Sequence, residues 1–200
     1  KRGAIGMPHD AHCVLDVEEF EKLVLPALVK PIERLDATDV EHLREGAARY
    51  QDDILAGFID DWALREREKQ RRHYFNVLGR LMQISTLAQD HAGAIGYAQR
   101  ILDRDMLRED IHRELMRLLL ANGQRALALR QFERCRDALR RELAIQPMRD
   151  TMVLYQQIAA RAVAGEDDDA DAPAARSAWA DAPVRAASPD YPVHVAYTSS

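Results

Sequence analysis

The stretch GQRALALRQFERCRDALRRELAIQP, residues 123–147, keeps a thin line of apolar residues among many charged ones. The apolar residues follow at three- and four-residue steps, the spacing of one face of an α-helix: Ala128, Phe132, Cys135, Leu139 and Leu143. The arginines fall mainly on the other faces, where the intervening acidic residues can pair with them. The stretch therefore predicts a helix with a narrow buried face and with arginines that face water.

A second stretch, AIGYAQRIL at residues 94–102, has the same design as ALRQFERCR at residues 128–136. In each, a small residue is followed four positions later by an apolar one. The two units are 34 residues apart, which is the period of a tetratricopeptide helix pair. Small residues at such positions let antiparallel helices approach closely. The repeat core is therefore expected at Ala94, Ala98, Ala128, Phe132, Cys135 and Leu139.

Helical periodicity continues over most of the chain. Residues 16–30 form one expected helix, which Pro26 should end or kink. The next is expected to begin at a capping box made by Thr38 and Glu41, and a long helix is expected from Asp60. The pattern predicts an all-α fold, a tetratricopeptide-like array of about seven antiparallel helices.

The composition predicts three segments. Residues 1–13 read as a linker, residues 14–163 as the helical domain, and residues 164–200 as an acidic tail rich in Pro and Ala. The tail is expected to be disordered because it cannot bury enough apolar surface to offset its ordering entropy. Its segment YPVHVAY, residues 191–197, has the content of an edge strand. The chain begins without Met, so a piece of a longer protein is expected.

Charge and cysteine usage exclude several classes of protein. The net charge of -5 argues against general adhesion to DNA or membranes. Cys13 and Cys135 lie far apart, so neither a disulfide framework nor a zinc site is expected, and a reducing cytoplasm is the natural location. The sequence has no signal-peptide pattern and no apolar run long enough for a membrane span.

The sequence lacks the motifs of common catalytic sites. It has no Gly-rich phosphate loop, no nucleophile elbow and no HExxH pattern, so no enzyme, cofactor or metal is expected. Trp62 follows Asp60 and Asp61, and it is interpreted as a core anchor at a helix start. His112 has no second histidine at ligand spacing and is given a structural or capping role. Cys135 is interpreted as a small core residue.

A basic span provides the candidate interaction surface, which consists of Arg65, Arg67, Arg71 and Arg72. Glu66 and Glu68 interrupt this span, and the pattern around it forms a core. Phosphate neutralisation needs cations without acidic partners, so direct binding of DNA by this span is not expected.

Four blocks carry a resemblance to a known family, in the order LDVEEFEKL (15–23), GFIDDWALREREKQRRHYFNVLGRL (57–81), MLREDIHRELMRLLLANGQRALALRQFERCRDALRRELAIQP (106–147) and TMVLYQQI (151–158). Together they resemble the bacterial transcriptional activator domain of SARP-type regulators, from Val14 to Arg161. Two positions depart from the family pattern: Met106 stands where Pro is frequent, and Gln89 where Gly often opens the repeat turn.

The resemblance implies a regulatory and protein-interaction domain of a bacterial transcription regulator. Domains of this family usually follow a winged-helix DNA-binding domain, which is absent from this chain. The expected partners are RNA polymerase or that winged helix, and a second copy of the chain in a homodimer. DNA would be bound only through the missing domain.

Two other functions remain open. One is a sensory module whose helix-array groove binds a small molecule or second messenger and shifts an equilibrium of the regulator. The other is a tetratricopeptide adaptor that docks a peptide and has no role in transcription.

Overall fold

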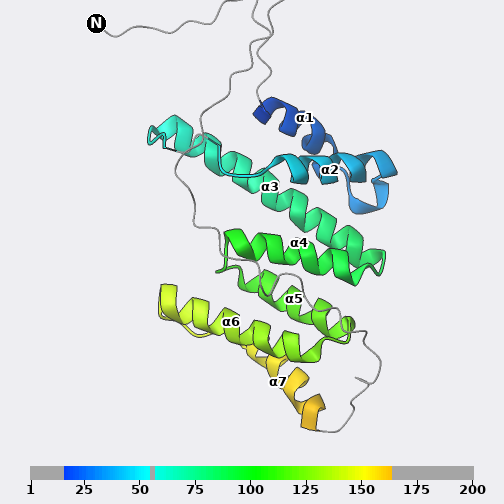
Figure 1. Ribbon diagram of the computed structural model, residues 1–200, viewed down its shortest axis with the longest axis vertical. Helices are drawn as coiled ribbons and strands as arrows, with labels where there is room; N and C mark the ends of the chain where they lie inside the picture. The colour runs from blue at the N-terminus through cyan, green and yellow to red at the C-terminus, as the bar shows by residue number, and fades with distance from the viewer. Residues whose placement is uncertain (1–15, 55–56, 164–200) are drawn as a thin grey trace, which may run out of the picture. The chain divides into compact units, whose positions relative to one another are not determined.

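The computed structural model describes residues 16–54 and 57–163, which belong to one compact unit of the chain. Within these ranges the chain forms seven α-helices and no strand (Figure 1), so the all-α prediction is confirmed. The expected linker, the expected tail and the segment 191–197 lie outside the described residues. The helices are α1 (Asp16–Val29), α2 (Ala37–Arg49), α3 (Asp61–Leu87), α4 (His91–Arg104), α5 (Glu109–Ala121), α6 (Arg125–Leu143) and α7 (Arg149–Val163), with a short 3-10 helix η1 (Ile32–Arg34).

The helices pack in the order in which the chain makes them (Figure 1). Helix α1 packs against α2 and α3, α3 packs against α4, and α5 packs against α4, α6 and α7. The connections from α3 onward are short, so neighbouring helices run antiparallel. The result is a stack in which each helix covers the apolar face of the one before it.

The turns that open α4 and α6 repeat each other in backbone geometry. Gln89 has φ 58° and Gly123 has φ 70°, and these two residues are 34 positions apart. After each, the next residue donates its N–H to a carbonyl five positions back, as Asp90 does to Ser85 and Gln124 does to Leu119, both at 2.8 Å. The repeat read from side-chain spacing is thus also present in the main chain.

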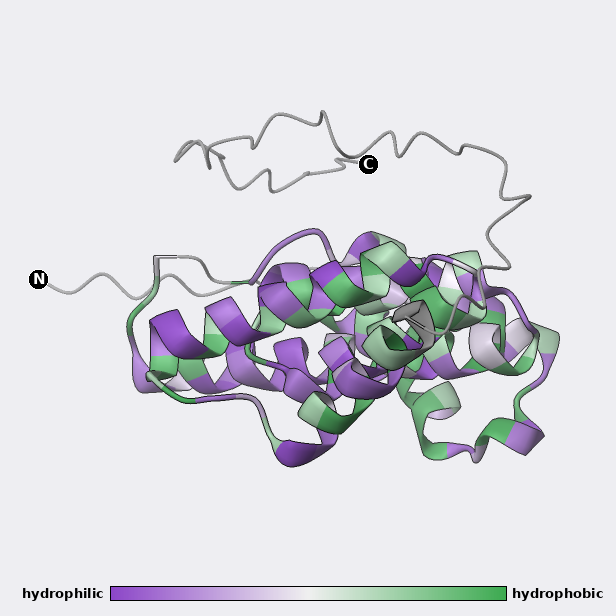
Figure 2. Ribbon diagram, turned by 90° about the horizontal axis from the view of Figure 1, so that it is seen from below, coloured by the Kyte–Doolittle hydropathy of each residue, from purple (hydrophilic) through white to green (hydrophobic). Residues whose placement is uncertain are grey.

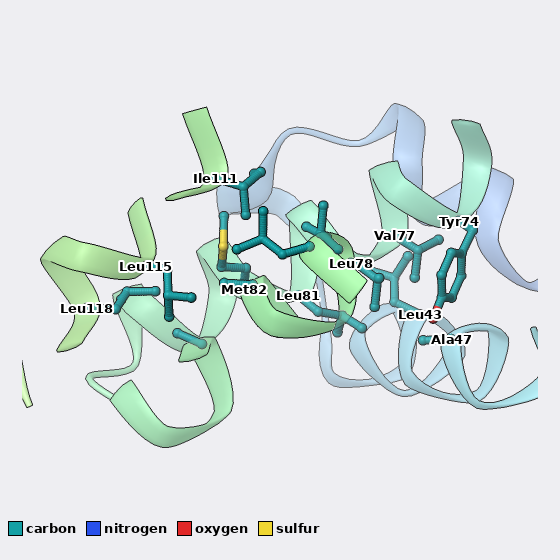
Figure 3. Close-up of a cluster of buried hydrophobic side chains, with 14 of the residues drawn as sticks. Leu43, Ala47, Tyr74, Val77, Leu78, Leu81, Met82, Ile111, Leu115 and Leu118 are labelled. Carbon is teal, nitrogen blue, oxygen red and sulfur yellow. The ribbon is translucent and has the colours of Figure 1, made fainter. Parts of the chain in front are cut away.

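The core runs through the interior of the stack. Figure 3 shows side chains from α2, α3 and α5 meeting there, among them Leu43, Leu78, Leu81, Met82 and Leu115. Hydrophilic and hydrophobic residues both occur along the helices in Figure 2, as expected for helices with one buried face. Burial of this continuous apolar surface is the main favourable term that holds the stack together.

Two local expectations for α1 and α2 need revision. The capping box of α2 is made by Asp36 and Asp39, so the prediction of Thr38 and Glu41 was wrong. The Asp39 N–H donates to the Asp36 carboxylate at 2.8 Å, and the Asp36 N–H donates to Asp39 at 3.1 Å. The Lys30 ammonium lies 2.7 Å from Asp39 and nine positions before it, and this contact from outside the helix favours the pair. Helix α1 continues through Pro26 and ends within one turn of it.

Candidate protein-interaction surface

The structure divides the four arginines of the predicted surface into two pairs. Arg67 donates to the backbone carbonyl oxygens of Ile54 and Phe58, at 3.0 and 3.2 Å. Arg71 donates to the carbonyl oxygen of Arg104 at 2.9 Å, and it lies over the ring of Phe75. These two guanidinium groups therefore hold the fold together and do not form an open phosphate-binding face.

The other pair, Arg65 and Arg72, is exposed on α3. Neither has an ion pair or hydrogen bond with another residue in the part of the chain that the structure describes. They are seven positions apart, and the exposed Glu68 lies between them, one helical turn from each. This arrangement leaves little uncompensated positive charge on α3.

Polar and charged side chains in the middle of α3 make contacts with α1. The Lys69 ammonium lies 2.8 Å from Glu21 of α1 and 2.9 Å from Glu66. Gln70, which is buried, donates to the carboxylates of both. The hydrogen bonds from Gln70 and Lys69 hold the pKa of Glu66 below its ordinary value. The network fixes α1 against the first half of α3.

An aromatic and arginine cluster fixes the segment that follows α2. Tyr50 and Tyr74 are stacked with ring centroids 4.2 Å apart, and the Arg104 guanidinium lies over both rings at 5.4 and 5.3 Å. Arg100 donates to the Tyr74 hydroxyl at 3.0 Å, and Arg104 donates to the carbonyl oxygen of Gln51. Arg100 and Arg104 were not among the residues predicted from the sequence, where the only signal was two arginines four positions apart on the expected repeat helix.

An exposed apolar cluster lies at the start of α3 and just before it. It consists of Phe58, Ile59 and Trp62 and is here called the α3 apolar cluster. These side chains are 52%, 86% and 56% exposed. The prediction that Trp62 anchors the core was wrong. In Figure 1 the first turns of α3 extend beyond α1, α2 and α4, the helices that it packs against, which agrees with the exposure of Trp62. Phe58 and Ile59 were not predicted as surface residues either, although two apolar residues directly after Gly57 in an expected turn are a signal in the sequence.

A groove of about 770 Å³ lies between α3 and α5, with Leu28 and Ile32 at one side. Gly79 is one of the residues that line it, and an added Cβ there would meet nothing within 4 Å. The charged side chains of the groove already have partners. Arg80 donates to the carbonyl oxygens of Leu28 and Lys30, both at 2.9 Å. Arg108 binds both carboxylate oxygens of Asp110, and Glu114 lies 3.2 Å from Arg117.

His112 is a buried structural residue, as expected from its spacing. Its Nε2 lies 3.0 Å from the Met106 carbonyl oxygen, which can only accept, so Nε2 carries the proton. Its Nδ1 then accepts from the Gln131 amide at 2.7 Å. Burial lowers the pKa of His112, against the opposing effect of the bond to Met106. This imidazole is therefore neutral near pH 7 and ties α5 to α6.

The repeat residues singled out in the sequence lie inside the stack: Ala94, Ala98, Ala128, Phe132, Cys135 and Leu139 are all buried, and Leu143 is exposed. Phe132 stacks on Tyr155 of α7 with ring centroids 4.1 Å apart. Burial raises the pKa of the Cys135 thiol to about 12, so that thiol is protonated and unreactive near neutral pH.

Residues 16–54 and 57–163 contain no group of three His, Cys, Asp or Glu side chains arranged to hold a metal ion. None of the helices in these ranges is both long enough and apolar enough to cross a membrane.

Comparison with known proteins identifies the family. The family described as "Bacterial transcriptional activator domain" matches residues 15–159. Among solved structures, Mycobacterium tuberculosis EmbR in complex with a low affinity phosphopeptide is similar, with 16% identity and a TM-score of 0.49. That likeness covers 73% of this chain and 38% of the EmbR chain. No curated protein matches the chain. Since the family match spans most of the helical stack, the chain belongs to the bacterial transcriptional activator domain family.

Proposed function

We propose that this domain is the regulatory and protein-interaction part of a bacterial transcription regulator. It acts with a winged-helix DNA-binding domain on the same protein, and it transmits regulation to RNA polymerase or to a second copy of the regulator. Membership of the family supports the transcriptional context. The cytoplasm is the expected location for this role.

The observation that carries the proposal is the α3 apolar cluster. An aromatic side chain at the centre of an interface often contributes most of its binding energy, and Trp is enriched at such positions. Trp62 and its neighbours are exposed, and Arg67 donates to the carbonyl oxygens of Ile54 and Phe58 in the segment before them. A main chain that is already held in place loses less conformational entropy when a partner covers its side chains. The proposed contact surface for a protein partner is therefore the α3 apolar cluster.

Substitution of Trp62 in the full regulator tests the proposal. We expect Trp62→Ala to reduce transcription from the target promoter by at least about 10-fold, as for an interface hot spot. Leu143→Ala is the matched control, because Leu143 is 52% exposed at the end of another helix, α6. Unchanged output with Trp62→Ala, or a full-length gene without a winged helix, would contradict the proposal.

A second candidate function is ligand sensing in the groove between α3 and α5. The groove volume of about 770 Å³ lies in the range of small-molecule sites, which is the observation that favours it. The pairing of Arg80 and Arg108 within the protein leaves no free cation there to orient a phosphate or carboxylate. Thermal shift with a panel of nucleotides and metabolites separates the two functions, because a ligand at 100 times its Kd adds about 2.7 kcal/mol.

A further inference from the structure

A second cavity, of about 520 Å³, lies among α1, α3 and the segment that follows α2. It is separate from the groove between α3 and α5, with which it shares no lining residue. Its volume falls within the range of small-molecule sites. The wall combines apolar and aromatic side chains with one buried amide: Val17, Phe20, Tyr50, Ile54 and Gln70.

Gln70 brings an unmet hydrogen-bond acceptor to this cavity. Gln70 is 1% exposed, and its Nε2 donates to the carboxylates of Glu21 at 2.5 Å and of Glu66 at 2.8 Å. Ionised carboxylates only accept, so the amide cannot be turned round and the position of Oε1 is fixed. This oxygen is buried and has no hydrogen-bond partner among the residues that the structure describes. Buried acceptors nearly always have a partner, so a donor from a bound molecule is expected there.

The cationic side chains at the cavity are already bound by groups of the protein. Arg49 lines the cavity, and its guanidinium lies 2.7 Å from both Glu19 and Glu45. Arg104 donates to the carbonyl oxygen of Gln51, which also lines the cavity. A phosphate or a carboxylate would have to compete with these partners, so the cavity is poorly suited to an anion.

Acceptors and negative charge, in contrast, are available. Asp52 lines the cavity with a carboxylate that is 94% exposed and 3.7 Å from its nearest cation, Arg104. Glu21 and Glu66 bring two negative charges to Gln70, against the single charge of Lys69, which pairs with both. The local field therefore favours a cationic donor over a neutral one.

The aromatic part of the wall also suits a cation on an apolar stem. The rings of Phe20 and Tyr50 have centroids 5.7 Å apart, and both residues line the cavity. Aromatic rings attract ammonium groups and pack against methylene groups equally well.

We propose that this cavity binds a protonated primary amine carried on an apolar stem. The ammonium group has three N–H donors and no acceptor, which matches a wall that offers acceptors. It donates to Oε1 of Gln70, the charge of Asp52 favours it, and the stem packs against Phe20 and Tyr50. Free alkylamines and the lysine side chain of another protein share this chemistry.

NMR titration of the full chain with n-pentylammonium tests the site. We expect the side-chain amide signals of Gln70 and the backbone amide signals of residues 17–20 and 50–54 to shift. For so small a ligand, a Kd on the order of 1 mM is expected. Pentanoate has a stem of the same length and the opposite charge, and it should bind at least about 10-fold more weakly.

Two variants at the cavity and one control locate the binding. Val17→Phe fills the cavity from α1 without changing its polar groups, and it should abolish the shifts. Gln70→Met removes the acceptor and should weaken binding at least about 10-fold. Gly79→Leu fills the separate groove between α3 and α5, where an added Cβ meets nothing within 4 Å, and should leave binding unchanged. Val17→Phe keeps the contacts of Gln70 with α1, so it decides the matter even where Gln70→Met fails to fold.

The lysine peptide Ac-Ala-Lys-Ala-NH2 separates the two sources of the amine. Tighter binding of the peptide than of n-pentylammonium supports a lysine of a protein partner, and the reverse supports a small-molecule amine. Three results overturn the proposal: no shift with either probe, equal affinity for pentanoate, or shifts that persist in Val17→Phe. The titration needs no promoter and no partner domain, so its outcome is independent of the proposed role in transcription.

Discussion

At the scale of single residues, Phe132 and Arg130 occupy opposite faces of α6. Phe132 is 4% exposed and stacks on Tyr155, while Arg130 is exposed and has no partner among the described residues. We expect Phe132→Ala to lower the free energy of unfolding by about 3–5 kcal/mol through lost burial and a residual cavity. Arg130→Ala should change it by less than about 0.5 kcal/mol. Urea melts measure both, and equal small losses would show that the buried face of α6 has been misassigned.

His112 predicts a pH dependence of stability. Because burial lowers its pKa in the folded protein, the unfolded chain binds a proton first as the pH falls. The stability present above pH about 6.5, the ordinary value for histidine, is therefore lost progressively as the pH falls toward the lower folded pKa. We expect His112→Gln, which can keep both hydrogen bonds, to flatten this loss. Urea melts of both proteins between pH 7.5 and 5, at about half-unit steps, measure the difference. If both proteins lost the same stability between pH 7.5 and 5, the pH dependence could not be assigned to His112.

At the scale of elements, the turns before α4 and α6 share one backbone conformation but differ in residue. Gln89 adopts a positive φ of 58°, which costs a residue with a side chain about 1 kcal/mol, whereas Gly123 adopts 70° at no such cost. We expect Gln89→Gly to raise the free energy of unfolding by about 1 kcal/mol in urea melts. Gly123→Ala is the reciprocal control and should lower it by a similar amount, since an added Cβ there meets nothing within 4 Å. A loss of stability in Gln89→Gly would mean that the side chain of Gln89 contributes more than its backbone strain.

At the scale of the whole molecule, the net charge of -5 predicts weak binding to DNA. Arg67 and Arg71 bind main-chain carbonyl oxygens, and Glu68 lies between the two exposed arginines of α3. We expect the chain to bind duplex DNA without sequence preference, at or beyond the weak end of the range of about 10⁻⁴–10⁻⁶ M seen for non-specific binding. A mobility-shift titration at physiological salt measures this. Sub-micromolar, sequence-selective binding would instead favour direct recognition of DNA.

The same contacts show why the sequence predicts some parts of the molecule better than others. Helical spacing and the 34-residue period are local properties, so they predict the helices and the buried faces of α4 and α6. The backbone follows the same period, because Gln89 and Gly123, which both have a positive φ angle, are 34 positions apart. The capping box of α2 was misplaced because Asp36 and Thr38 are both good capping residues. The contact that favours the Asp36 box is the ion pair of Lys30 with Asp39, the second residue of that box.

Amino-acid sequence alone determined the fold class, the register of the repeat and the family to which the domain belongs. Tertiary structure alone decided which charged and aromatic side chains remain available to a partner. Arg71 donates a hydrogen bond to a carbonyl oxygen 33 residues away in the sequence, and Arg100 donates one to a carbonyl oxygen 53 residues away. These bonds make both guanidinium groups less available to a partner. Trp62 becomes available because α3 extends beyond the helices that would otherwise cover it. Such contacts depend on which helices meet in space, and the periodicity of a single helix carries no information about its distant neighbours.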